Sequence, residues 1–236
     1  MLHQVPEDRA APPVADEQRR RWHAYYTEKR ITHQWFQVHL LRDLPVTDIL
    51  EVGPYWGLVT AMLANAGYRV TTLDVSPMPP PLGAVGHVQA DIRALKPEQC
   101  AGHDAIIACE VLEHIHWPQV DGVLAAMAAS GTPWLILSVP FEGTQFGMNL
   151  YWNRHVFRRR SFLRKLRFLK RFRIRDHEDF DAHKWEVGYR ETPLSALREK
   201  VEAAGWRIER QDFTADCRSV FLVCRNARPA ASAAGP

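Results

Sequence analysis

The feature that most constrains the fold of this chain is a short apolar run that ends in a glycine-bracketed turn. Residues 49–52 are apolar apart from Glu51, and Gly53 and Gly57 bracket the step that follows. Residues 58–66 are rich in Ala, Leu and Met, which favours a helix. Glycines in such a turn let the backbone bend sharply and approach a ligand, and the helix N-terminus offers unpaired amides. The segment predicts a nucleotide or carboxylate site between a strand and a helix.

The alternation of strand and helix continues along the chain. We expect further strands at 69–74, 85–90, 104–109, 134–139, 206–211 and 219–224, and helices at 118–129 and 193–204. Strands that alternate with helices at this spacing indicate a parallel sheet with helices on both faces. The connection between the last two strands is short enough only for a hairpin, so one of them must run antiparallel. The sequence therefore predicts a doubly wound α/β fold.

Size and composition fit one domain. The 236 residues are 46% hydrophobic and 24% charged, as in ordinary globular proteins. The net charge of +3 is too small to indicate a nucleic-acid-binding protein by itself. The four cysteines lack the Cys-x-x-Cys spacing of a zinc site, and we expect no metal. No secretory signal or long apolar run is present, so we expect a cytoplasmic protein without a transmembrane segment.

Composition also suggests boundaries within the chain. Residues 1–17 and 227–236 are polar or rich in Pro and Ala, and we expect them to be flexible ends. Residues 18–45 carry the aromatic and basic pattern of one or two amphipathic helices, which either cover the site as a lid or pack on the core. Residues 46–226 form the domain. It includes an insertion at 141–191, after the fifth strand, that is far longer than a simple connection needs.

Four stretches of the predicted core follow one another in a characteristic order along the chain. They are Ile-Leu-Glu-Val-Gly-Pro-Tyr-Trp-Gly (49–57), Val-Thr-Thr-Leu-Asp-Val-Ser (70–76), Gln-Ala-Asp-Ile (89–92) and Asp-Ala-Ile-Ile-Ala-Cys-Glu-Val-Leu-Glu-His-Ile (104–115). In this order and spacing they resemble the class I (Rossmann-like) S-adenosylmethionine-dependent methyltransferases. The resemblance covers roughly residues 46–140 and implies that family's seven-stranded, mostly parallel sheet with one antiparallel strand. An NADP enzyme would need G-x-G-x-x-G, which the spacing here does not supply.

The resemblance implies a cofactor site for S-adenosylmethionine, with S-adenosylhomocysteine as the product. The residues that it assigns to this site are Glu51, Gly53, Tyr55, Gly57, Asp74, Val75, Asp91, Ile92 and Glu110. Within this set Glu51 would meet the methionine part, Asp74 the ribose and Asp91 the adenine. From the residues alone, Asp74 and Asp91 would equally cap the segments that follow them. The family commonly has a third glycine where Tyr55 stands, so this loop is bulkier than usual.

Methyl transfer asks little of the protein beyond placing a nucleophile in line with an activated methyl group. A general base helps when the acceptor is a hydroxyl or an ammonium. His114 and His116 follow the fourth strand at the carboxyl edge of the sheet, where ligands of open α/β sheets bind. We therefore take both as candidate bases, with a structural role as the alternative. The predicted activity is methyl transfer to an oxygen or nitrogen atom of a small, polar or anionic acceptor.

The insertion is the predicted acceptor side. Its candidate acceptor-binding residues are Asn149, Tyr151, Trp152, Arg158, His183, Trp185 and Glu186, with packing as the alternative for Trp185. Residues 154–175 hold eleven Lys and Arg and no acid, and their apolar residues share one helical face. This pattern predicts a basic amphipathic helix that is either a solvated face or a contact with an anion. Two alternatives follow: an RNA methyltransferase that uses this helix for phosphate contacts, and a non-catalytic protein that binds a membrane surface or a partner. The oligomeric state is not indicated.

Overall fold

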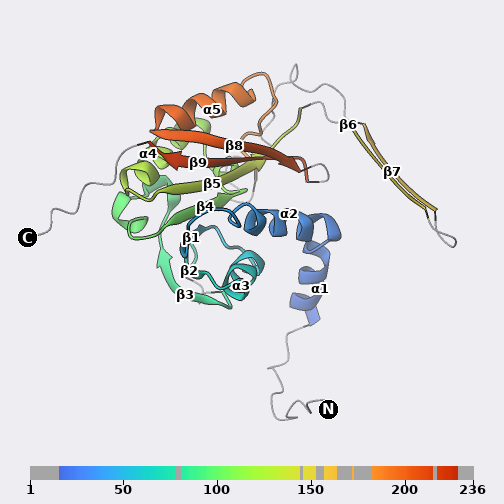
Figure 1. Ribbon diagram of the computed structural model, residues 1–236, viewed down its shortest axis with the longest axis horizontal. Coiled ribbons are helices and arrows are strands. Elements are labelled where there is room, and N and C mark those ends of the chain that lie inside the picture. Colours follow the sequence, from blue (N-terminus) through green and yellow to red (C-terminus); the bar gives the residue numbers. More distant parts are fainter. Residues whose placement is uncertain are drawn as a thin grey trace, which may run out of the picture.

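A computed structural model describes residues 16–77, 81–143, 146–152, 157–163, 172, 182–214 and 217–227. At its centre is a seven-stranded sheet in the order β3-β2-β1-β4-β5-β9-β8 (Figure 1). The strands are β1 (Asp48–Val52), β2 (Arg69–Asp74), β3 (Ala84–Gln89), β4 (Ala105–Cys109), β5 (Trp134–Pro140), β8 (Trp206–Thr214) and β9 (Ser219–Asn226). No helix among the described residues is long and apolar enough to cross a membrane.

The direction of the strands confirms the predicted α/β topology. The pairs β1–β2, β1–β4, β2–β3 and β4–β5 are parallel. Strand β9 runs antiparallel to both of its neighbours, β5 and β8, and is therefore the one reversed strand. Because the order reverses between β1 and β4, the crossovers cover opposite faces and leave a crevice at the carboxyl ends of these strands.

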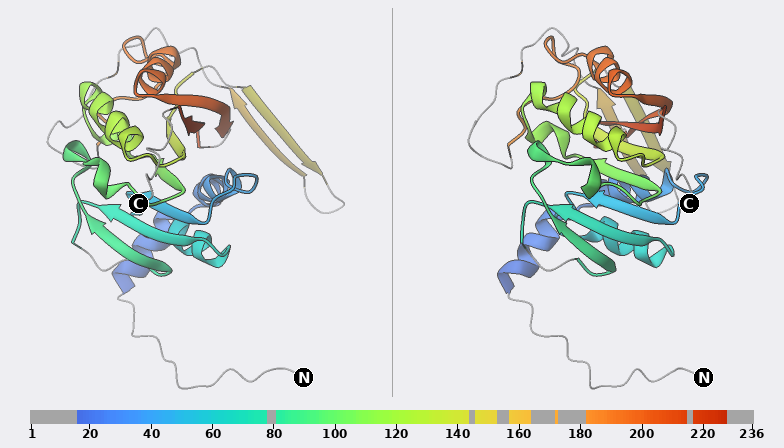
Figure 2. Two further views of the ribbon diagram at one scale, coloured as in Figure 1. Left: turned by 60° about the vertical axis from the view of Figure 1, so that its left-hand side comes forward. Right: turned by 90° about the vertical axis from the view of Figure 1, so that its left-hand side faces the viewer.

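Helices cover both faces of the sheet (Figure 2). They are α1 (Asp16–Tyr25), α2 (Glu28–His39), α3 (Leu58–Asn65), α4 (Val120–Ala129) and α5 (Leu194–Ala203), with short 3-10 turns η1 (Ile92–Ala94), η2 (Pro97–Gln99), η3 (Leu112–His114) and η4 (Trp117–Gln119). The apolar strands feed two clusters because successive side chains point to opposite faces. Leu50 and Ile106 pack with α4 and α5, whereas Ile49 and Ile107 pack with α2 and α3.

The insertion begins and ends at one point of the sheet. Phe141 forms a parallel bridge with Val187. The Glu142 amide donates to the Val187 carbonyl (2.7 Å), and the Val187 amide donates to the Pro140 carbonyl (3.0 Å). Between these points, β6 (Phe146–Trp152) and β7 (Phe157–Leu163) pair as a separate antiparallel ribbon that projects away from the main sheet in Figure 1.

The predicted basic helix over 154–175 is wrong for residues 157–163, which form β7. Tyr151 pairs with Arg158 and Trp152 with Phe157. Aromatic residues favour strands, and two such runs separated by four residues are a hairpin signal, which here outweighs the apolar helical spacing. Apart from Phe172, the rest of that range lies outside the described residues. So do most of the expected flexible ends, 1–17 and 227–236.

Candidate functional site

A cavity of about 710 Å³ lies at the carboxyl ends of β1, β2 and β4, within the range of small-molecule sites. The turn after β1 contributes Gly53, the end of β2 contributes Asp74, and the turn after β4 contributes Glu110. Helix α2 covers the opening with Arg30 and His33. The predicted position of the ligand site at this edge of the sheet therefore coincides with a cavity.

The turn after β1 requires glycine at two positions because of the backbone conformation there. Gly53 has a φ of +68° and Gly57 a φ of +76°, values that L side chains rarely adopt. A Cβ on Gly53 would lie 2.8 Å from Cγ2 of Val111, so a larger residue would displace the loop after β4. The Gly53 amide donates to the Leu73 carbonyl at 2.8 Å. The turn is thereby fixed between β2 and β4.

Tyr55 stands in the left-handed region, with a φ of 49°. A non-glycine residue there costs about 1–2 kcal/mol, so the loop keeps a glycine-like backbone without the glycine. Its side chain is 62% exposed, and its ring lies 4.8 Å from that of Tyr25. Tyr55 lines the cavity together with Tyr25. The Tyr55 side chain, which makes this loop bulkier than usual, thus contacts Tyr25 of α1 at the rim of the cavity.

Glu51 is a buried acid within an apolar strand. It lines the cavity, and its Oε2 accepts a hydrogen bond of 2.5 Å from the Thr60 hydroxyl of α3. Burial raises the pKa of Glu51 to about 7, and the Thr60 hydrogen bond acts in the opposite direction. A carboxyl that is this poorly solvated favours a cationic partner in the cavity.

Asp74 and Val75 lie at the wall formed by the end of β2. The Asp74 Oδ1 accepts from the Ser76 amide at 2.8 Å, as expected of a cap. The carboxylate nevertheless lines the cavity, as does Val75, which is 46% exposed. A carboxylate at this position suits a pair of ribose hydroxyls. Asp74 therefore fixes the turn after β2, where residues 75–77 are not helical, and its side chain still lines the cavity.

Asp91 takes the capping position that the sequence allowed for it. It caps η1 through a 2.9 Å hydrogen bond from the Arg93 amide to its Oδ1. The Arg93 guanidinium binds both carboxylate oxygens, which holds the pKa of Asp91 below its ordinary value. Asp91 is not among the cavity-lining residues, whereas its neighbours Ala90 and Ile92 are. The carboxylate is thus engaged by Arg93 beside the cavity, and its contact with adenine stays a prediction.

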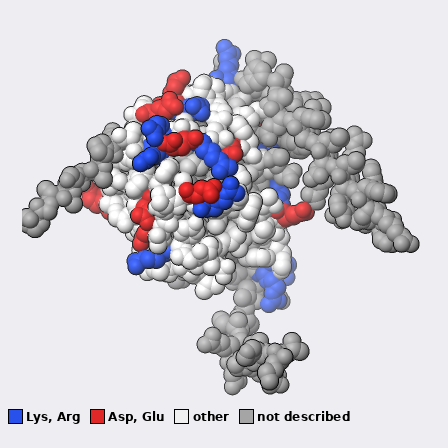
Figure 3. Space-filling view, viewed as in Figure 1, with Lys and Arg blue, Asp and Glu red and all other residues white. Residues whose placement is uncertain are grey.

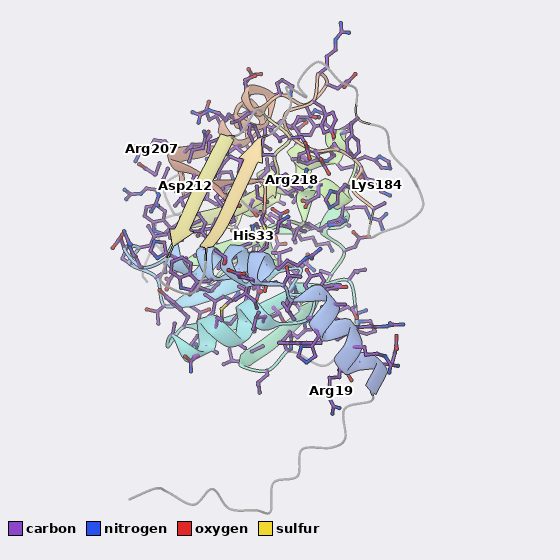
Figure 4. The ribbon with its side chains drawn as sticks, turned by 90° about the vertical axis from the view of Figure 1, so that its right-hand side faces the viewer. Arg19, His33, Lys184, Arg207, Asp212 and Arg218 are labelled. Carbon is purple, nitrogen blue, oxygen red and sulfur yellow. The ribbon has the colours of Figure 1, made fainter. Side chains whose placement is uncertain are left out.

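Acidic and imidazole groups gather at the other end of the cavity. Glu110 has a φ of 55°, and its Oε1 accepts from the Ser138 hydroxyl at 2.8 Å. His33 Nε2 lies 3.8 Å from that same oxygen. Burial lowers the pKa of His33, so its imidazole is neutral at pH 7, and neither ring nitrogen has a hydrogen-bond partner among the described residues. Figure 4 shows His33 on α2 facing the ends of β8 and β9, on the side of Arg218.

Glu113, His114, His183 and Glu186 line the same end. Glu113 is fully buried, and burial, followed by the charge of Glu110, raises its pKa well above the ordinary value. The His114 and His183 rings are 5.1 Å apart, edge to face. His183 Nδ1 lies 3.0 Å from the Glu186 Oε1. Residues from the turn after β4 and from the last part of the insertion therefore meet at this point.

Solved structures similar to this chain share one fold. No protein-family model matches the sequence, and no protein of curated function matches it. The 1,6-didemethyltoxoflavin-N1-methyltransferase of Burkholderia thailandensis, solved with its acceptor and S-adenosylhomocysteine, is 17% identical with a TM-score of 0.53, covering 90% of this chain and 84% of that one. The N-methyltransferase NodS of Bradyrhizobium japonicum WM9, in complex with S-adenosylhomocysteine, is 14% identical with a TM-score of 0.54, covering 88% and 92%.

Magnesium protoporphyrin IX methyltransferase of Synechocystis PCC 6803, with bound S-adenosylhomocysteine, is likewise 14% identical with a TM-score of 0.54, covering 89% of this chain and 95% of that one. These matches extend over 88–90% of this chain. The chain has the class I methyltransferase fold. The resemblance seen in the sequence at residues 46–140 is therefore confirmed at the level of the fold.

Within the methyltransferase fold, the predicted site residues separate into three groups. The cavity is lined by Glu51, Gly53, Tyr55, Asp74, Val75, Ile92, Glu110, His114, His183 and Glu186. The described positions outside its lining are Gly57, which starts α3, Asp91, His116 and Trp185. Asn149, Tyr151, Trp152 and Arg158 have a described backbone on the β6–β7 ribbon, and their acceptor contacts stay a prediction.

Two of the predicted site residues, His116 and Trp185, lie outside the cavity lining. His116 is exposed, precedes η4 and does not line the cavity, because the chain turns away after Ile115. Trp185 is buried in the core, its ring packs edge to face on Trp117, and its Nε1 donates to the Ile115 carbonyl at 3.0 Å. A large aromatic group gains more from such burial than from facing water.

Sequence reasoning missed His33 as a member of this site. Its position in an amphipathic helix gives no signal that distinguishes it from a packing residue. Arg30 and Lys29 of α2 and Arg218 before β9 also line the cavity and were not predicted. Arg218 forms an ion pair with the buried Glu142. Their presence makes the α2 side of the opening cationic, in contrast to the acidic end at Glu110.

Proposed function

We propose that the protein transfers the methyl group of S-adenosylmethionine to an oxygen or nitrogen atom of a small, polar or anionic acceptor. The observation that supports this most is that one cavity is lined by two chemically different sets of residues, which we take as its two ends. The Gly53 turn, Asp74 and Ile92 form an end that suits an amino acid and a nucleoside. Glu110, His114 and His33 form an end that suits a nucleophile and its proton.

The groups at the first end match the parts of the cofactor. Asp74 would accept hydrogen bonds from the ribose hydroxyls, while Val75 and Ile92 would contact the adenine through apolar surface. Glu51 would accept from the ammonium of the methionine part, which would keep its carboxyl ionised. Bound S-adenosylmethionine supplies an activated methyl group on a sulfonium, so the protein's task is to place the acceptor in line with it.

The second end would serve the acceptor. The His33 nitrogens have no hydrogen-bond partner among the described residues, and Nε2 lies 3.8 Å from the Glu110 carboxylate. His33 could therefore take a proton and be stabilised as a cation by that carboxylate. Lys29, Arg30 and Arg218 line the opening and would attract an acceptor that carries a carboxylate or phosphate. These cations are the reason for preferring an anionic acceptor.

Binding of the cofactor tests the first half of the proposal. We expect S-adenosylhomocysteine to bind in calorimetry, and Asp74→Ala to weaken it at least tenfold, because two charge-assisted hydrogen bonds are each worth about 1.5–3 kcal/mol. Asp121→Ala is the matched control, since Asp121 is an exposed carboxylate on α4 that pairs with Lys200. Equal affinity of the wild type and the Asp74 variant would refute the assignment of the site.

The acceptor class is tested with radiolabelled S-adenosylmethionine and a fractionated bacterial extract. We expect label in the small-molecule fraction. Label in RNA would instead support the alternative that the basic residues of 154–175 contact phosphates, and that activity should fall steeply with salt. The face seen in Figure 3 argues for a small acceptor, because Lys and Arg there are interspersed with Asp and Glu. Among the described residues, Arg207–Glu209 and Arg210–Asp212 are ion pairs in which positive charge is neutralised in this way.

A further inference from the structure

Three potential metal ligands meet in the wall of the cavity. Glu113 and His114 belong to η3, directly after β4, and His183 lies at the far end of the insertion. One ligand atom of each residue lies within 4.8 Å of the other two. All three residues line the cavity. Two residues from one turn and a third from a distant segment therefore converge on a single point.

Two hydrogen bonds fix this convergence. The Lys184 amide donates to the Glu113 carbonyl at 2.7 Å, and the Trp185 indole donates to the Ile115 carbonyl at 3.0 Å. Both bonds join the residues that follow His183 to the turn that carries His114. Because the Trp185 side chain is buried in the core, His183 is held on a rigid base rather than on a free loop. A preformed site of this kind loses little entropy on binding a ligand.

Glu113 is a buried acid at the centre of this cluster. Its side chain is fully buried, yet neither carboxylate oxygen has a hydrogen-bond partner among the described residues. Leaving such a group unsatisfied costs at least about 1–3 kcal/mol, so buried charged groups are almost always paired or bound to a metal. The carboxyls of Glu110 and Glu186 line the same end of the cavity. The local surplus of carboxyl groups favours a cation.

The surroundings of His183 are those of a metal ligand. Its Nδ1 lies 3.0 Å from the Glu186 Oε1, which leaves Nε2 as the nitrogen available to an ion. Histidines that bind metals commonly donate their other ring N–H to a carboxylate, which fixes the tautomer and makes the imidazole a better ligand. Glu186 would thus orient the His183 ring without binding the ion itself.

We propose that Glu113, His114 and His183 bind one divalent first-row transition-metal ion in the wall of the cavity, with Glu186 orienting His183. Two imidazoles and one carboxylate suit such ions better than Mg²⁺ or Ca²⁺, which prefer oxygen ligands only. Ligands on opposite sides of an ion at about 2.1 Å lie about 4.2 Å apart, so small side-chain rotations close the site. The sequence-based expectation of no metal rested on cysteine spacing and did not address this ligand set.

The site narrows the acceptor class, a step that rests on the proposed function. Three protein ligands leave a coordination position open toward the cavity. A hydroxyl bound there would have a lowered pKa. Its proton would pass to water, its oxygen would bond to the methyl carbon, and the electron pair of the broken S–C bond would stay on sulfur as S-adenosylhomocysteine. The geometry therefore favours an oxygen acceptor over a nitrogen acceptor.

The test is metal binding by the full chain after stripping with a chelator. We expect one Mn²⁺ or Zn²⁺ per chain in calorimetry, and the electron paramagnetic resonance signal of free Mn²⁺ to fall on mixing. Glu113→Gln and His183→Asn should each weaken Mn²⁺ binding at least tenfold. Glu186→Gln should weaken it by about tenfold as an outer partner. His116→Ala, an exposed histidine two residues from His114, is the matched control and should retain wild-type affinity.

Two results would overturn the proposal: no stoichiometric binding of Mn²⁺, Zn²⁺, Fe²⁺ or Co²⁺, or equal affinity in the wild type and in His183→Asn. His183→Asn is included because its partly exposed side chain can be replaced with less risk to folding than that of Glu113. S-adenosylhomocysteine binding is measured in parallel on the wild type. Metal binding without cofactor binding would refute the proposed function but not the metal site. Cofactor binding without metal binding would refute the metal site but not the proposed function.

Discussion

Replacing Glu51 by glutamine is expected to stabilise the ligand-free protein at neutral and alkaline pH. Burial raises the pKa of Glu51 from 4.5 to about 7, and the Thr60 hydroxyl opposes only part of this effect. Each tenfold change in proton affinity is worth about 1.4 kcal/mol, so ionised Glu51 costs the folded state about 3 kcal/mol. Glutamine has nearly the same shape, and its amide oxygen can still accept the Thr60 hydroxyl.

The direction of the pH dependence of stability follows from the raised pKa of Glu51 in the folded state. Because the pKa of Glu51 is higher in the folded than in the unfolded state, its stabilising contribution is present below pH 4.5 and is lost as the pH rises through about 7. Glutamine does not titrate. The difference in unfolding free energy between Glu51→Gln and the wild type should therefore grow in favour of the variant by about 2–3 kcal/mol between about pH 5 and about pH 8.

Urea denaturation of both proteins at several pH values, followed by circular dichroism, measures this difference. Glu199→Gln, on an exposed part of α5, controls for the loss of one carboxylate. We expect that control to stay within about 0.5 kcal/mol of the wild type throughout. A Glu51→Gln difference that does not change with pH would refute the reasoning, because it would mean that the carboxyl is not desolvated in the fold.

Three further predictions concern single contacts. Gly53→Ala should lower the unfolding free energy by about 2 kcal/mol or more, because its Cβ meets Val111 and its φ of +68° is strained for alanine; urea denaturation measures this. Trp185→Ala should lower it by about 3–5 kcal/mol, whereas Trp185→Phe should lose much less; a similar small loss for both would contradict the buried position. Asp91→Asn should change S-adenosylhomocysteine affinity less than threefold in calorimetry, since Asp91 is engaged outside the cavity.

The core could be predicted because local signals and long-range packing agree there. The strand at 69–74 has the expected bounds, and the helix after Gly57 starts where the glycine turn requires. Successive residues of β4 are buried on opposite faces of the sheet, so Ala105 and Ile106 enter different clusters, as the two-residue period of a strand requires. In such segments the residues determine the fold with little help from distant parts of the chain.

The rest of the site depends on contacts that no local pattern contains. Asp91 and Arg93 form a local ion pair that competes with the expected ligand contact. Trp185 is drawn into the core by its hydrogen bond to Ile115, seventy positions away in the chain. That same bond brings His183 beside His114. The aromatic ribbon of β6 and β7 was missed because apolar helical spacing and hairpin spacing coexist in one basic stretch.

The two ends of the insertion lie next to each other, so its middle part can be replaced by another segment. The chain leaves the sheet at Phe141, and its return is anchored by Lys184, Trp185 and Val187. The part of the insertion that carries β6 and β7 is therefore an excursion from a finished scaffold. The entropy of closing such a loop grows slowly with its length. A shorter, longer or differently charged ribbon can therefore replace β6 and β7, in natural relatives or by design. The sheet would be unaltered, while the chemistry that meets a new acceptor would change.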